Sequence, residues 1–76
     1  MNIEKSLSVG DKIQFEDAYY VITSAKTKNV VVDKFLNGSQ TPYESDCKYD
    51  KKYLVAKMSH GKALIYTTDG TVIDIF

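Results

Sequence analysis

The chain has 76 residues, enough for one small domain, and its ten lysines balance ten acidic residues, so no net charge attracts nucleic acid or an anionic membrane. It has no arginine, and its single cysteine and single histidine exclude an intrachain disulfide and a zinc site built from Cys and His. No apolar run has the length of a signal or a membrane span, so we expect a cytoplasmic protein in which residues 1–76 form one domain.

The first half of the chain has the composition and spacing of β-strands. After an arm or short strand over residues 1–8, Gly10-Asp11 introduces a strand over 12–16, in which Ile13 and Phe15 alternate with polar residues. A tight turn at 17–18 leads into a second strand over 19–25. A polar turn then joins it to a third strand over 30–36, so the two long strands form a central hairpin.

The second half begins with 16 residues, 37–52, in which the apolar pattern is interrupted. We predict a long loop there, with room for a single helical turn over 44–49. Three further strands follow over 53–58, 63–68 and 71–76, with Asp69-Gly70 as a two-residue hairpin turn. The sequence therefore predicts an all-β fold, a small antiparallel five- to six-stranded SH3-like barrel or bent roll.

The two central strands are apolar on both faces, so periodicity leaves open which face is buried. In the C-terminal half, the alternation predicts a set of inward side chains and a set of outward ones that form an apolar stripe. The inward set is Leu54, Ala56, Met58, Ile73 and Ile75, and the outward set is Tyr53, Val55 and Val72. Such a stripe would serve as a protein interface, for self-association or for a partner.

Two resemblances add to this reading. The run SVGDKIQF, followed after short turns by YYVI and NVVVDKF, resembles the opening of SH3-like barrels of the Tudor and KOW type over residues 8–36. It departs from those families where they carry an aromatic cage or a basic RNA-binding loop, so no binding residue is transferred. The composition, free of arginine and rich in Lys, Asp and Tyr, is similar to that of small bacteriophage accessory proteins, which implies binding and disabling of a host or defence component.

Tyrosines and lysines around the long loop are the candidate contacts. Tyrosine combines a large rigid contact area with a polar tip, which favours it at protein interfaces. The predicted partner-binding residues are Tyr43, Tyr49, Lys51, Lys52, Tyr53 and Val55. The alternative for the loop tyrosines is that they fold back and plug one end of the barrel.

A second set of lysines gives the alternative function. Lys26, Lys28 and Lys48, with Lys51 and Lys52, would bind nucleic acid if tyrosines stacked on the bases. The competing interpretation is a solvated loop, because Glu44, Asp46 and Asp50 offset the lysines.

No residue pattern points to catalysis or to a cofactor. The acidic residues do not match a calcium loop, and neither Cys47 nor His60 has a neighbouring partner for nucleophilic chemistry, so we expect no metal, no cofactor and no enzyme activity. The sequence thus favours a non-enzymatic protein-binding module, in specific form a phage-encoded inhibitor of a bacterial host or defence protein. The alternatives are a small nucleic-acid-binding β-barrel and a homo-oligomeric subunit.

Overall fold

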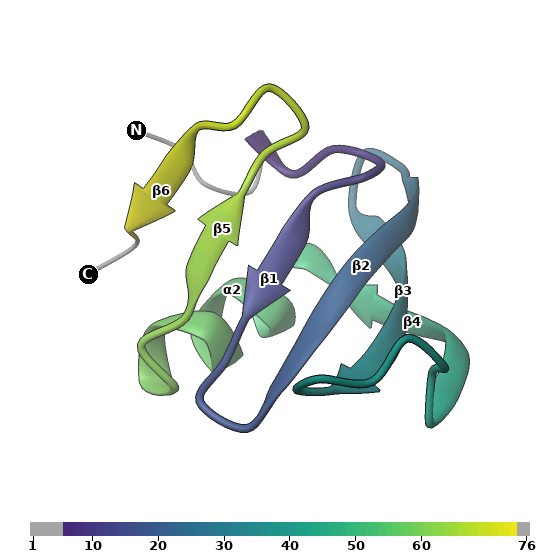
Figure 1. Ribbon diagram of the computed structural model, residues 1–76. Coiled ribbons are helices and arrows are strands. Elements are labelled where there is room, and N and C mark those ends of the chain that lie inside the picture. The colour runs from purple at the N-terminus through teal and green to yellow at the C-terminus, as the bar shows by residue number, and fades with distance from the viewer. Residues whose placement is uncertain (1–5, 75–76) are drawn as a thin grey trace.

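The computed structural model describes residues 6–74, which form a six-stranded antiparallel sheet and a helix packed on it (Figure 1). The strand order is β4-β3-β2-β1-β5-β6, and every pair of neighbours is antiparallel. The elements are β1 (Lys12–Gln14), β2 (Ala18–Ala25), β3 (Asn29–Leu36), β4 (Glu44–Asp50), α2 (Lys51–His60), β5 (Leu64–Tyr66) and β6 (Val72–Asp74). The predicted all-β antiparallel class is confirmed.

The sheet is bent but does not close on itself. Figure 1 shows β6, β5, β1 and β2 side by side, with β3 and β4 curving towards α2, which lies behind the sheet. Among the described residues, the edge strands β4 and β6 are not paired with each other. Of the two predicted architectures, the bent roll is therefore the one present.

The concave face of the sheet and one face of α2 form the core. The largest fully buried side chains come from five of these elements and are Ile13, Ile22, Val30, Val32, Leu54, Met58 and Ile65. Burial alternates along the central hairpin, which shows which of its two apolar faces lies in the core. Tyr20 and Ile22 of β2 face inwards, whereas Val21 lies on the outer face.

The turn before β1 requires a glycine. Gly10 has a φ of +93°, and a Cβ at this position would lie 2.7 Å from Cγ2 of Thr68. The Gly10 N–H donates to the carbonyl of Ile22 over 2.8 Å, and the buried Asp11 carboxylate accepts from the Ser8 N–H over 3.1 Å. The Gly-Asp step thus joins the N-terminal segment to both β2 and the β5–β6 turn.

The prediction of a strand over residues 53–58 is wrong, because these residues belong to α2. Leu54 and Met58 are four residues apart, so they share one helix face and are both fully buried, a spacing that also fits strand alternation. The Asp50 carboxylate caps the helix by accepting from the N–H groups of Lys52 and Tyr53. The capping residue Asp50 is therefore the signal that favours a helix over a strand.

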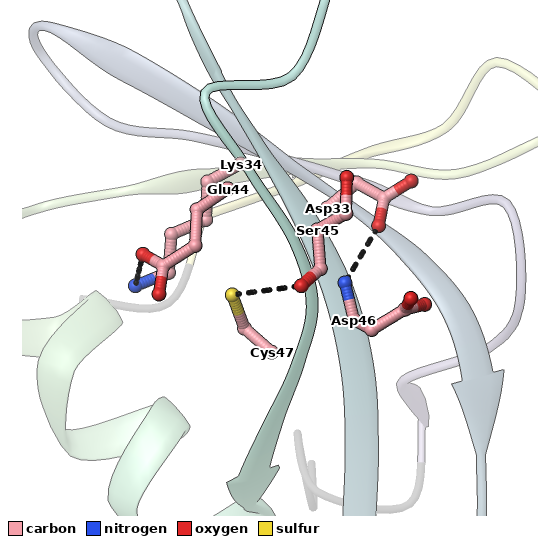
Figure 2. Close-up of polar contacts among 6 residues, drawn as sticks. All are labelled: Asp33, Lys34, Glu44, Ser45, Asp46 and Cys47. Carbon is pink, nitrogen blue, oxygen red and sulfur yellow. Dashed lines mark hydrogen bonds and ion pairs between the residues drawn. The ribbon is translucent and has the colours of Figure 1, made fainter.

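The predicted long loop over 37–52 is also wrong in its second part, since residues 44–50 form β4 instead of a loop or a helical turn. β4 is a mostly exposed edge strand, which explains its polar sequence. A bulge at Ser45–Asp46 interrupts the pairing with β3, and the Asp33 carboxylate accepts from the Asp46 N–H over 3.1 Å (Figure 2).

The predicted apolar stripe does not form as expected. Ala56 is exposed and Val55 is half-buried against the core, because a helix replaces the strand alternation. Tyr53 and Val72 are exposed but belong to the helix and to β6, and Ile75 lies outside the described residues.

Candidate functional site

A row of aromatic rings runs from the core to the surface beside the start of α2. The Tyr20 ring contacts Phe15 with centroids 4.8 Å apart. Tyr49 stacks between Tyr20 and Tyr53, at centroid distances of 6.2 and 5.9 Å and with interplanar angles of 8°. Tyr20 is only 6% exposed whereas Tyr53 is 60% exposed, so the row connects a buried anchor to a ring in solvent.

Strand pairing places a lysine against this row. Lys34 pairs with Tyr20 across β2 and β3, and its Nζ lies 5.3 Å from the Tyr20 ring centroid and 5.0 Å from that of Tyr49. Its partner carboxylate is Glu44, at 3.4 Å, and Figure 2 shows the two side chains next to each other. The Lys34 side chain is 14% exposed, so its contacts with the rings are largely shielded from water.

The ionisation of this cluster follows from the contacts. Burial lowers the pKa of Lys34, but Tyr49, Tyr20 and Glu44 outweigh it and raise the pKa above its ordinary value. Burial raises the pKa of Tyr20 to about 12, although Lys34 acts in the opposite direction. At neutral pH Lys34 is therefore a charged ammonium and Tyr20 a neutral phenol.

The predicted partner-binding residues divide by exposure. Tyr43 and Tyr53 are 53% and 60% exposed, and Lys52 is also exposed. Tyr49 and Val55 are half-buried and Lys51 is 8% exposed. The Tyr43 N–H donates to the Lys34 carbonyl over 2.9 Å, which anchors Tyr43 to the strand that carries the lysine. We call Tyr43, Tyr49 and Tyr53 the tyrosine surface.

The predicted nucleic-acid-binding lysines lie close to this surface. Lys26 and Lys28 are in the β2–β3 turn, and the Lys51 N–H donates to the Lys28 carbonyl over 2.8 Å. Lys48 lies on β4 opposite Val31. The structure therefore brings together two lysine groups that are about twenty residues apart in sequence.

Sequence reasoning missed Lys34, Tyr20 and Phe15 as parts of the site. The alternation in the central hairpin and its cross-strand register carry a signal for Tyr20 and Lys34. That signal could be used only once the inner face of the hairpin was known, because both faces are apolar.

A second aromatic group lies on the outer face of the sheet. Tyr19 stacks on Phe35 with centroids 4.8 Å apart, and the Lys12 ammonium lies 4.6 Å from the Tyr19 ring and 5.8 Å from that of Tyr66. The Tyr19 hydroxyl donates to the Ser39 carbonyl over 2.6 Å. These rings are engaged within the chain, unlike the exposed ends of the tyrosine surface.

Cys47 is the free thiol in the part of the chain that is described. Burial raises the pKa of the Cys47 thiol, which donates to the Ser45 carbonyl over 3.7 Å (Figure 2). In the part of the chain that is described, no three His, Cys, Asp or Glu side chains are grouped to hold a metal ion. None of the helices described there is long and apolar enough to span a membrane.

Comparison of the chain with protein-family models, with curated proteins and with solved structures gives no match.

Proposed function

We propose that the protein is a non-enzymatic protein-binding module and that the tyrosine surface is its contact site. The observation that carries the proposal is the exposure of Tyr53 and Tyr43, each more than half accessible, beside an aromatic row anchored in the core. Lys52, Lys51 and Val55 flank the surface on α2.

The tyrosine surface favours binding because its side chains are already partly ordered in the folded protein. Tyr53 stacks on Tyr49, and Tyr49 stacks on the buried Tyr20, so fewer rotamers are lost when a partner covers the exposed ring. Tyrosine is also enriched among the few residues that dominate interface energies. A partner that covers both exposed rings would gain apolar contact and retain hydrogen bonds to the hydroxyls.

The specific form of the proposal is an inhibitor, encoded by a phage, that acts on a bacterial host or defence protein by occluding a surface of it. Support for this form comes from the composition, which has no arginine and is rich in lysine, aspartate and tyrosine. A small rigid module with an exposed aromatic surface is suited to covering a surface of its target, because covering requires contact area and no catalytic group.

Affinity capture from nuclease-treated bacterial lysate tests the proposal, if two double variants are compared. Tyr43→Ser with Tyr53→Ser removes the exposed rings, whereas Tyr66→Ser with Val72→Ser removes exposed apolar side chains from the other end of the sheet. We expect one partner that wild type and the second variant retain at high salt and the first variant loses. Equal capture by both variants would refute the tyrosine surface as the contact site.

A further inference from the structure

Lys28 and Lys52 meet where the β2–β3 turn lies against the start of α2, with Lys26 in the same turn and Lys48 two residues before Asp50 on β4. Thr27, Lys28, Asp50 and Lys52 line a hollow at this point. The hydrogen bond from the Lys51 N–H to the Lys28 carbonyl fixes the turn to the helix. We call the exposed members of the group, Lys26, Lys28, Lys48 and Lys52, the lysine corner.

Positive charge exceeds negative charge at the lysine corner, although the whole chain is neutral. The carboxylate that lines the hollow belongs to Asp50, and it already accepts from the N–H groups of Lys52 and Tyr53, over 2.8 and 3.4 Å. Glu16 and Asp17 lie in the β1–β2 turn, at the opposite end of β2. Asp50 keeps its negative charge while it caps α2, and Asp46 lies two residues from Lys48 on β4, so these carboxylates offset only part of the charge of the four lysines. The remaining positive charge is available to an external anion.

An exposed aromatic ring lies immediately beside these lysines. Tyr53 follows Lys52 in the first turn of α2, one face of its ring stacks on Tyr49, and 60% of the residue is accessible. Sequence-tolerant binding of single strands combines two components, lysines that bind the phosphates and an aromatic ring that stacks on a base. The absence of arginine removes the side chain that most often reads guanine edges, which also favours binding without sequence preference.

We propose that the lysine corner and Tyr53 bind single-stranded nucleic acid, as an activity separate from protein binding. The lysines are carried by the β2–β3 turn, by β4 and by α2, so they present several positive charges to a chain of phosphates instead of one charge to a single anion. Tyr53 then stacks on a base through the ring face that Tyr49 leaves open.

The test is fluorescence anisotropy of a labelled 12-nucleotide oligo-dT titrated with the purified full chain at several salt concentrations. If all four lysines contact phosphates, log K falls with log salt with a slope of about −2.8, and binding weakens about fifty-fold between 50 and 200 mM salt. Replacing Lys28 and Lys52 by Gln reduces the slope to about −1.4. Tyr53→Leu weakens binding at every salt concentration and leaves the slope unchanged.

Lys57→Gln with Lys62→Gln is the control, because it removes the same charge near the other end of α2. We expect it to leave both affinity and slope within error of wild type. Absence of binding at 50 mM salt would overturn the proposal. An equal effect of the two lysine pairs, or equal binding of poly-glutamate of the same charge, would also overturn it by showing diffuse attraction to any polyanion. Because the probe is a purified oligonucleotide, each of these results leaves the protein-binding proposal standing.

Discussion

Replacement of Lys34 tests how the tyrosine surface is held in place. Its ammonium lies between the rings of Tyr20 and Tyr49 and 3.4 Å from the Glu44 carboxylate, and the side chain is 14% exposed. A cation–π contact is worth about 0.5–1 kcal/mol when exposed and about 2 kcal/mol when shielded. Glu44 is 56% exposed, so the ion pair contributes at most about 1 kcal/mol.

These magnitudes predict an order of destabilisation among three variants. Lys34→Met keeps the buried stem and loses the charge, so we expect it to cost about 1–2 kcal/mol. Lys34→Ala also loses about three buried methylene groups, at about 0.8 kcal/mol each, and should cost about 3–4 kcal/mol. Glu44→Gln removes the ion pair alone and should cost less than about 1 kcal/mol.

Urea unfolding followed by circular dichroism measures these differences, in low salt and in 1 M NaCl. We expect salt to reduce the small effect of Glu44→Gln and to leave that of Lys34→Met nearly unchanged, because the rings shield the ammonium. If Glu44→Gln costs as much as Lys34→Met, and salt abolishes both effects, then the ion pair and not the aromatic contacts holds Lys34, and the reasoning fails.

Three further predictions concern the turns and caps of the fold. Lys62 has a φ of +55° in the Schellman motif that ends α2, so Lys62→Gly should raise the free energy of unfolding by about 1 kcal/mol, and a loss of stability in urea unfolding would contradict this. Asp50→Ala removes the cap of α2 and should cost about 1 kcal/mol with a weaker helical signal at 222 nm, whereas unchanged unfolding would disprove the capping role. Burial raises the pKa of Asp11 above 3.8, so the folded state keeps this proton to higher pH than the unfolded chain, and wild type should lose stability relative to Asp11→Asn as pH rises from 3 through the raised pKa. The opposite trend in urea titrations across that pH range would show that the hydrogen bond to Ser8 dominates instead.

Local signals predicted the first half of the fold well. The alternation around Ile13 and the β-branched hairpin specify structure through neighbouring residues, and the structure contains β1, β2 and β3 there. In the second half, the turn signal at Asp69-Gly70 correctly marked the β5–β6 hairpin. Gly70 has a φ of +90°, but the turn is longer than the predicted two residues, because the Thr67 N–H donates to the Thr71 carbonyl over 2.9 Å and residues 68–70 form the loop.

The second half depended on tertiary contacts that periodicity does not encode. β4 is polar because it is an edge strand, and it is extended because β3 pairs with it and not because of its own propensity. In α2, Leu54 and Met58 fit both a strand and a helix, so Asp50 as a capping residue and the turn at Gly61 were the decisive signals. The aromatic row could not be predicted because Tyr49 reaches Tyr20 only through β4.

The tyrosines of the site were predicted from residue type, while their arrangement was not. Tyr43, Tyr49 and Tyr53 were candidates because they are aromatic residues in a polar stretch. The stack of Tyr49 between Tyr20 and Tyr53, however, depends on a strand and a helix that the sequence pattern did not indicate. Residue chemistry therefore identified candidates, and the fold selects which of them are exposed.

The affinity of the purified partner for the double variant Tyr43→Ser/Tyr53→Ser, measured by calorimetry against wild type, tests the central claim most directly. Exposed aromatic anchors are worth about 2 kcal/mol or more at an interface, so we expect affinity to fall at least about thirty-fold, with little dependence on salt. Tyr66→Ser/Val72→Ser should bind as wild type does. Unchanged affinity of the first variant, or an equal loss in the second, would contradict the account.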